Sequence, residues 1–274
     1  MRRRTIERPV SRTGLGISTG EQVTLSLDPA EPGNGLAIRR QDVGVDIPLH
    51  IEHAADAANC TAVRLGEHAV FVVEHLLATL WATGITDVRV SVDQEEVPIF
   101  DGSASAFLEM IEEAGVRDLA GHVEPIEVSE PVVLHEGHKL LAALPADRTT
   151  FYYYLEHPHR LIGRDHAVYA PDREAFGARL AGARTFVTEQ EARQLIAAGL
   201  LRGGDEGNAV VAYQDRLSEP VAPGGFAAHK IVDLLGDLYL LNRPLVGLVV
   251  ACRTGHAENR ALARQLAELS APPA

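Results

Sequence analysis

The sequence predicts an α+β protein built from two domains. Along its 274 residues, strand-like alternation of apolar and polar residues is followed by helical spacing twice, once in each half. At GVRDLAG, residues 115–121, the first helical pattern ends, and strand patterns begin again shortly afterwards. We therefore expect an N-terminal domain over residues 1–121 and a C-terminal domain over residues 122–274.

The elements follow from the period of the apolar residues, which is about 2 in a half-buried strand and about 3.6 in a helix. In the first half, strands are expected over residues 23–27, 35–40, 68–72 and 88–92, and helices over residues 75–82 and 104–114. In the second half, strands are expected to begin at Ile126, Val132 and Lys139 and to cover residues 151–155 and 245–251. Helices are expected there over residues 189–198, 227–239 and 258–269.

Charge and composition limit the partners and the compartment. The formal net charge is −13, from 38 acidic and 25 basic residues, which repels phosphate backbones and excludes nucleic acid as a bulk partner. It leaves room for a local basic pocket that takes one phosphorylated small molecule. The two cysteines, Cys60 and Cys252, are too few for a disulfide framework and favour a reducing compartment. No apolar run is long enough for a secretory signal or a membrane span, so we expect a cytoplasmic protein. We also expect the protein to be a monomer.

Two stretches carry residues suited to metal chemistry. In HKIVDLLGD, His229 and Asp233 stand four apart and share one helix face, with Asp237 a turn further on and Lys230 about a quarter turn round. A third ligand from His75, in VEHLLATL, would complete a zinc site that keeps one position open for water. Zinc lowers the pKa of such a water to about 7, and a neighbouring carboxylate could then take its proton.

Glu74 is the carboxylate that the sequence offers beside His75. Neighbouring residues on a helix diverge by about 100°, so Glu74 and His75 converge on one site only where a strand becomes a helix. The expected strand over residues 68–72 puts them at such a junction. Other interpretations remain, because His229 and Asp233 could form an exposed ion pair and His75 could be a hydrogen-bonded core histidine. A site of this kind could also take Fe²⁺ in place of Zn²⁺.

Taken together, five ordered motifs resemble the UDP-3-O-acyl-N-acetylglucosamine deacetylases, the zinc amidases of lipid A synthesis. The motifs are VEHLLATL (73–80), VPIFDGSASAF (97–107), ARTF (183–186), HKIVDLLGDL (229–238) and GHAEN (255–259). The opening stretch, RRRTIERPVSRTGLGISTG, also resembles the start of the family, so the likeness covers nearly the whole chain. It implies two domains of similar topology, each a helix layer against a β-sheet layer, with the active site between them.

The resemblance also implies a role for individual residues, each at a position that matches a family motif. Zn²⁺ would be held by His75, His229 and Asp233, while Glu74 would activate the water. His256, steadied by Asp237, would stabilise the oxyanion as an imidazolium and then protonate the leaving amine. The remaining implied residues are Thr185, which would hydrogen-bond the tetrahedral intermediate, and Lys230, Phe186 and Asn208, which would contact the acylated nucleotide sugar.

The chain departs from the family where the nucleotide is expected. Ser18 stands where the family carries a histidine in a G-L-H-S/T-G stretch, and Leu155 stands where it carries an aromatic residue. Residues 220–228, PVAPGGFAA, lack the arginine and acidic residues of the family and look like a loop. Three functions therefore stay open: the deacetylase of lipid A synthesis, a zinc amidase acting on a different N-acyl sugar or amide, and a non-catalytic metal-binding relative.

Overall fold

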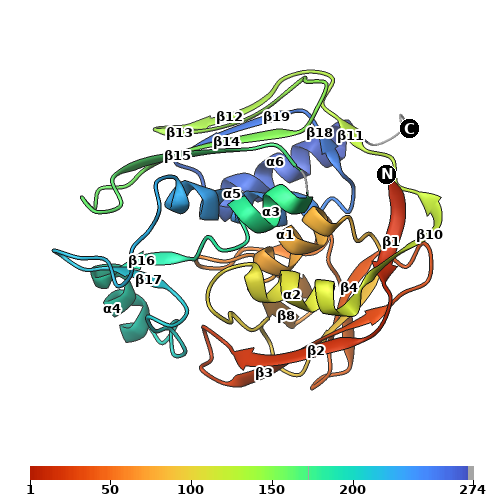
Figure 1. The fold of residues 1–274 in the computed structure, drawn as a ribbon, viewed down its shortest axis with the longest axis horizontal. Helices are drawn as coiled ribbons and strands as arrows, with labels where there is room; N and C mark the ends of the chain where they lie inside the picture. Colours follow the sequence, from red (N-terminus) through yellow and green to blue (C-terminus); the bar gives the residue numbers. More distant parts are fainter. Residues whose placement is uncertain (172, 271–274) are drawn as a thin grey trace.

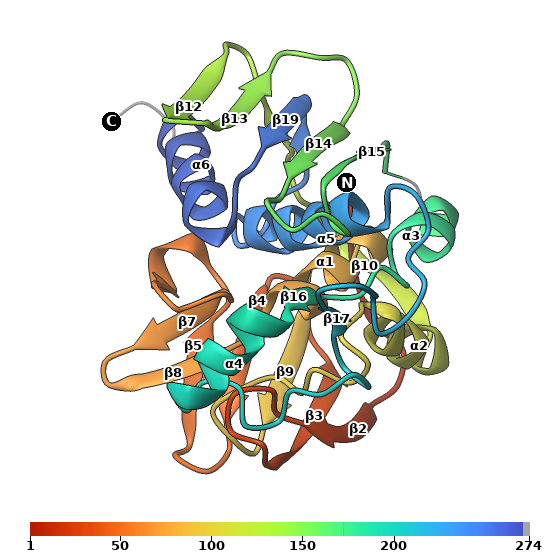
Figure 2. The same ribbon diagram turned by 90° about the vertical axis from the view of Figure 1, so that its left-hand side faces the viewer.

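Two open sheets lie on opposite outer sides of the molecule, with the main helices between them, as Figures 1 and 2 show. This computed structural model describes residues 1–171 and 173–270. The predicted second domain runs to residue 274, so its last four residues lie outside the described part. The mixture of sheets and packed helices confirms the predicted α+β class.

The first half of the chain forms one sheet with strand order β2-β3-β9-β4-β5. Only the contact between β9 and β4 is parallel, and the other neighbours are antiparallel. The elements are β2 (Val10–Leu15), β3 (Gln22–Pro29), β4 (Leu36–Arg40), β5 (Val45–Pro48), α1 (Glu74–Thr83), β9 (Val88–Val92) and α2 (Ser105–Ala114). The strands alternate buried and exposed residues, so their buried faces pack against the helix layer.

The second half repeats this topology in a sheet with strand order β12-β13-β19-β14-β15. Again the third and fourth strands in the order, β19 and β14, are the parallel pair. The elements are β12 (Val132–Glu136), β13 (Lys139–Leu144), β14 (Thr150–Glu156), β15 (Arg164–Tyr169), α5 (Gly225–Tyr239), β19 (Leu248–Cys252) and α6 (His256–Leu269). Helix α5 thus corresponds to α1, and α6 corresponds to α2.

Each half carries an insertion before its crossover helix. In the first half it holds η1 (Ile51–His53), β6 (Ala54–Ala55), β7 (Ala62–Leu65) and β8 (His68–Phe71). In the second half it holds α3 (Arg173–Arg179), β16 (Phe186–Thr188), α4 (Glu189–Ala197) and β17 (Val210–Ala212). In Figure 2, β7 and β8 lie at the lower left of the molecule, and α4 lies in the foreground below α5.

Most predicted elements are confirmed, and the differences have local causes. The stretch over residues 115–121, where the sequence predicts a break between the two halves, lies almost entirely in strand β10 (Val116–His122), which pairs with β1 (Arg2–Ile6). The strand predicted over residues 245–251 is divided at Gly247 into β18 (Leu245–Val246), which pairs with β11 (Ile126–Glu127), and β19. Gly247 has a φ of 157°, and a Cβ there would lie 2.7 Å from Val128 Cγ2.

Two helices begin two residues earlier than the sequence predicts. Helix α5 starts at Gly225, so part of the stretch over residues 220–228 is helical and was wrongly read as a loop. Its Phe226 packs edge-on against Phe186, with ring centroids 4.8 Å apart. Helix α6 starts at His256 and not at Glu258. The position of the domain boundary near residue 121 stays a prediction.

Helices α1 and α5 pack directly against each other in the middle of the molecule. The two helices approach closely at Gly236, where a Cβ would lie 2.0 Å from the carbonyl oxygen of Glu74. Every residue of α5 from Ile231 to Tyr239 is buried, so the helix cannot shift without disturbing the core. A glycine at this position therefore sets the distance between the two helices.

Replacing Gly236 by alanine is expected to destabilise the protein by at least about 1–3 kcal/mol, because the added methyl overlaps the backbone of α1. It should also lower the amount of metal bound, since α1 and α5 would be forced apart. Thermal unfolding and metal analysis of the purified variant measure both effects. Gly177→Ala in α3 is the matched control, because a Cβ there meets Leu108 Cδ2 at an ordinary 3.4 Å. Equal stability of the two variants would contradict the prediction.

Candidate active site

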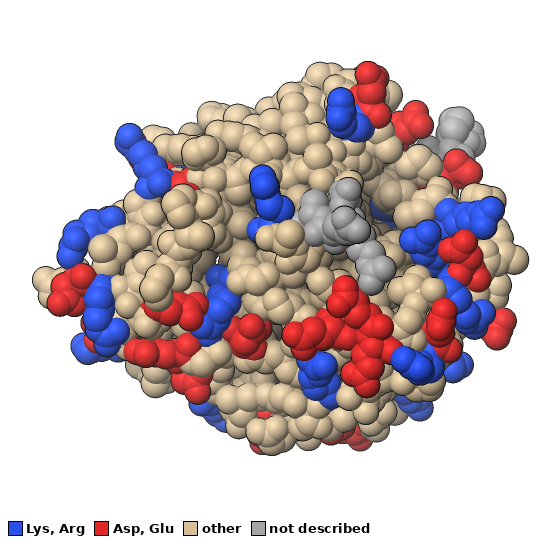
Figure 3. All heavy atoms as spheres, in the orientation of Figure 1, with Lys and Arg blue, Asp and Glu red and all other residues tan. Residues whose placement is uncertain are grey.

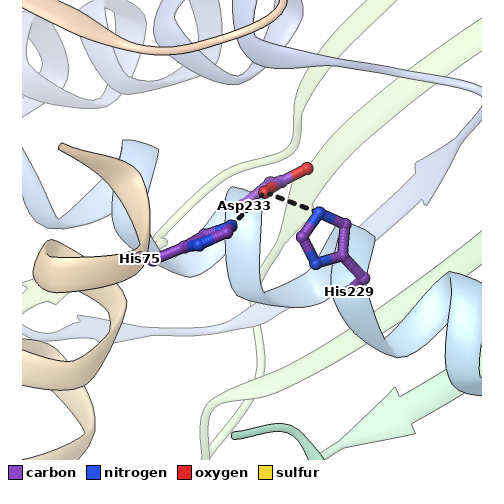
Figure 4. Close-up of side chains that lie close together, drawn as sticks. All are labelled: His75, His229 and Asp233. Atoms are coloured by element: carbon purple, nitrogen blue, oxygen red, sulfur yellow. Dashed lines mark ion pairs between the residues drawn. The ribbon is translucent and has the colours of Figure 1, made fainter. Parts of the chain in front are cut away.

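Helices α1 and α5 bring two histidines and an aspartate together at their contact, as Figure 4 shows. Asp233 Oδ1 lies 3.5 Å from His75 Nε2 and 3.5 Å from His229 Nε2. One ligand atom from each of the three buried residues lies within 4.8 Å of the others. Ligands at about 2.0–2.1 Å from a tetrahedral zinc ion lie about 3.3–3.4 Å apart, so the spacing fits a single metal ion.

The chemical state of His229 also fits a metal ligand. Burial lowers its pKa to about 3, against the opposing effect of Asp233, so the ring is neutral at pH 7. Its Nδ1 lies 3.2 Å from the carbonyl oxygen of Ala183, an acceptor for the ring N–H. The proton is thereby placed on Nδ1, and the lone pair of Nε2 faces Asp233 and His75.

Asp233 is held in its ionised form. Burial alone would raise its pKa, but the positive charge of Lys230, with smaller contributions from His229 and from a hydrogen bond of His75, lowers the pKa well below its usual value. Lys230 Nζ donates to Asp233 Oδ2 at 2.6 Å. Although Lys230 lies about a quarter turn round the helix from His229, its ammonium therefore reaches the face that carries Asp233. Residues three apart on a helix are neighbours, and the long lysine side chain spans the remaining angle.

Glu74 and His75 stand in the first turn of α1, at the strand-to-helix junction that the sequence predicts. The chain reaches that turn through Val72, whose φ of 62° is unusual for a β-branched residue. Glu74 is 4% exposed, and its Oε2 accepts the backbone N–H of Thr61 at 3.0 Å. Burial raises the pKa of Glu74 from its usual value, although the neighbouring histidines oppose this effect. A buried carboxyl with a raised pKa is suited to proton transfer.

His256, the first residue of α6, faces Glu74 from the other side. Its Nε2 lies 3.9 Å from Glu74 Oε1, and its Nδ1 lies 2.9 Å from Asp237 Oδ2. Burial lowers the pKa of His256, but the charge and hydrogen bond of Asp237, together with the charges of Asp233 and Glu74, outweigh burial and raise it to about 9. The imidazole is therefore protonated at neutral pH, with Nδ1–H directed at Asp237 and Nε2–H available to the site.

These groups line one large cavity of about 1720 Å³. Its lining includes the three candidate metal ligands, His75, His229 and Asp233, together with Glu74, His256 and Lys230. Ser18 and Leu155, which differ from the family pattern, lie in the same wall. Figure 3 shows acidic and basic side chains interspersed on one face of the molecule, with acidic ones gathered over α2.

Of the other predicted site residues, two line the cavity and two do not. Thr185 and Phe186 line the cavity, and the Phe186 ring lies 5.9 Å from that of His229. The Asn208 side chain instead holds its own loop, accepting from Asp205 N and donating to the carbonyl oxygen of Gly203. Asp237 is fully buried behind His256. The roles assigned to these residues stay predictions.

Sequence reasoning missed Thr61, which contacts both Glu74 and Asp237. Nothing in the local pattern NCTAV marks it, because its partners lie 13 and 176 residues away in the chain. It also missed Tyr153, a buried residue in the cavity wall whose hydroxyl donates to the carbonyl oxygen of Thr254 at 2.5 Å.

A two-histidine, one-aspartate group beside a buried carboxylate and an imidazolium, in a cavity between two α+β layers, defines a metal-dependent hydrolase. A model of the UDP-3-O-acyl N-acetylglycosamine deacetylase family matches residues 3–268. The chain belongs to this family, which confirms the resemblance drawn from its motifs. Within the described residues, no helix is both long enough and apolar enough to cross a membrane.

Three relatives, each named UDP-3-O-acyl-N-acetylglucosamine deacetylase, illustrate the extent of the match. The protein of an Anaeromyxobacter species is 37% identical over 266 residues, which cover 96% of this chain and 88% of the relative. The protein of Chlamydia felis is 36% identical over 270 residues, which cover 97% of this chain and 96% of the relative. The protein of Helicobacter hepaticus is 32% identical over 269 residues, which cover 97% of this chain and 90% of the relative. The similarity is therefore not confined to one domain.

Proposed function

We propose that the chain hydrolyses the N-acetyl group of UDP-3-O-acyl-N-acetylglucosamine in lipid A biosynthesis, using Zn²⁺ held by His75, His229 and Asp233. The observation that carries the proposal is the meeting of this triad with Glu74 and His256 in one cavity. The names of the relatives supply the substrate. Two free cysteines, Cys60 and Cys252, support a cytoplasmic location, and we propose that the protein acts there as a monomer.

The residues divide the chemistry of amide hydrolysis between them. When bound, Zn²⁺ supplies Lewis acidity, which lowers the pKa of water and polarises a carbonyl group. Glu74, as general base, takes a proton from the attacking water. His256, as an imidazolium, donates from Nε2, first to the developing oxyanion and then, by proton transfer, to the leaving amine. Separate groups thus remove and deliver protons: burial raises the pKa of Glu74, which makes its carboxylate a stronger base, and the neighbouring carboxylates keep His256 an imidazolium.

The cavity wall supplies the remaining groups. Thr185 offers a hydroxyl to the tetrahedral intermediate, and Phe186 offers an apolar edge beside His229. The ammonium of Lys230 contacts the nucleotide sugar from the floor of the cavity, where it is paired with Asp233. Asn208 acts through its loop, because its amide holds Gly203 and Asp205 in place.

The decisive experiment measures acetate release from UDP-3-O-acyl-N-acetylglucosamine by the purified full chain carrying one equivalent of Zn²⁺. Activity is expected to disappear after dialysis against a chelator and to return when Zn²⁺ is added, with Fe²⁺ compared in parallel. Simple N-acetyl sugars serve as the competing substrates, because Ser18 and Leu155 replace family residues in the cavity wall. Cleavage of a simple sugar without cleavage of the nucleotide substrate would favour the amidase alternative. Metal binding without any hydrolysis would favour the third function, that of a non-catalytic metal-binding relative.

A further inference from the structure

Thr61 lies between the two proton-handling groups of the site. It immediately precedes β7 and is fully buried. Its backbone N–H donates to Glu74 Oε2 at 3.0 Å, and its hydroxyl donates to Asp237 Oδ1. The same hydroxyl oxygen lies 3.2 Å from His256 Nδ1. One residue therefore touches the proposed base, the proposed acid and the carboxylate that orients the acid.

We propose that Thr61 is a positioning residue, which holds Glu74 and the His256–Asp237 pair at a fixed separation through its amide and its hydroxyl. The inference rests on the proposed function, in which Glu74 takes a proton from the attacking water and His256 delivers one to the leaving amine of the same substrate. Thr61 acts through these groups and does not need to touch the substrate.

The hydrogen bonds around Asp237 show why the hydroxyl matters. Oδ2 of Asp237 accepts from Asn259 Nδ2 at 2.8 Å and faces His256 Nδ1 at 2.9 Å, while Oδ1 accepts from Thr61. Asp237 is fully buried, so water cannot readily replace the Thr61 hydroxyl. With both oxygens fixed, the carboxylate plane is fixed, and with it the direction of the His256 ring.

The separation that Thr61 controls is short. Glu74 Oε1 lies 3.9 Å from His256 Nε2, and a substrate carbonyl must fit against both groups. Catalytic groups need to be held within about 0.5 Å, and a displacement of about 1 Å can cost about 10²-fold in rate. Loss of the hydroxyl frees the carboxylate to rotate, and the imidazole then loses its fixed direction.

Two other buried threonines, Thr79 and Thr83, have hydroxyls that bond only within their own helix. Thr79 and Thr83, both in α1, donate to carbonyl oxygens of their own helix, those of His75 and Thr79 respectively. Such bonds are local and satisfy the hydroxyl without fixing another element. Thr61 instead joins the insertion that precedes α1 to α5 and α6, which carry Asp237 and His256.

The test compares Thr61→Val, which keeps the shape but removes the hydroxyl, with Thr61→Ser, which keeps the hydroxyl. Thr83→Val is the matched control, a buried threonine whose hydroxyl stays within α1. Zinc content, thermal unfolding, kcat and KM are measured for each full-length holoenzyme. Thr61→Val is expected to lower kcat about 10–100-fold with KM within about 3-fold and one equivalent of Zn²⁺ retained. The kcat of Thr61→Ser should stay within about 5-fold of the wild-type value, and the kcat of Thr83→Val within about 2-fold.

A double-mutant cycle with Asp237→Asn separates positioning from stability. If Thr61 acts through Asp237, the loss caused by Thr61→Val becomes smaller once Asp237 is changed, so the two effects on kcat do not add. Additive effects, or equal losses in Thr61→Val and Thr61→Ser, would overturn the inference. A normal kcat for Thr61→Val would also overturn the inference, but an active enzyme of this kind would leave the proposed function standing. A folded, zinc-loaded wild type that leaves every offered amide intact would overturn both.

Discussion

Replacing Glu74 by glutamine is expected to lower kcat by about 10²–10⁴-fold, the range that general acid–base groups contribute, while zinc binding persists. Glutamine keeps the size of the side chain and can still accept the N–H of Thr61, but it cannot take a proton from water. The metal ligands are untouched by the change. Steady-state kinetics and metal analysis of the same preparation therefore give a loss of activity without a loss of Zn²⁺.

The control for this prediction is Glu67→Gln, in the turn between β7 and β8, whose side chain is 89% exposed. It removes the same charge from the protein without touching the cavity, so its kcat should stay within about 2-fold of the wild type. A Glu74→Gln variant that retains most of its activity would show that another group takes the proton. Loss of zinc along with activity would instead assign Glu74 to the metal site.

The pseudo-repeat of the fold explains how the ligands reach each other. Helices α1 and α5 occupy the same place in the two halves, each preceding the central strand of its sheet. They pack face to face, so the start of α1 lies against the middle of α5, where Gly236 permits contact. His75 from one helix thus meets His229 and Asp233 from the other.

The strongly periodic parts of this arrangement could be predicted from the sequence. The strand over residues 88–92 is predicted with the observed bounds, and the helix over residues 75–82 differs from α1 by one residue at each end. The spacing of His229 and Asp233 places both on one helix face, as the structure shows. These features depend on local periodicity, which a single sequence records.

The features that escaped prediction depend on distant partners. Strand β10 is stabilised by pairing with β1, more than 100 residues earlier, and its own burial pattern shows no alternation. The start of α6 at His256 is supported by the Glu258 side chain, which accepts the N–H of Gly255 at 2.8 Å. The contacts of Thr61 arise only when the insertion before α1 meets α5. No periodic pattern encodes such long-range contacts.

Replacing Asp237 by asparagine is expected to lower kcat by about 10²–10⁴-fold and to change the pH dependence of the reaction. The acid form of His256 is the active one, so activity is present below its pKa of about 9 and is lost as the pH rises through that value. Asp237 is the main cause of the raised pKa, and burial opposes it. Without the negative charge of Asp237, burial is less strongly opposed, the pKa of His256 falls, and the alkaline limb of kcat/KM moves to lower pH.

The acid limb provides an internal control for the Asp237→Asn variant. It reports the ionisation of the base, Glu74, whose pKa is raised chiefly by burial, so activity is lost as the pH falls through that value. Asp237 has only a small effect on the pKa of Glu74, whereas it is the main group that raises the pKa of His256. The acid limb should therefore move less than the alkaline limb. A pH profile of kcat/KM with constant zinc content measures both limbs. An alkaline limb that stays in place while kcat falls would show that Asp237 orients the imidazole of His256 but does not set its protonation.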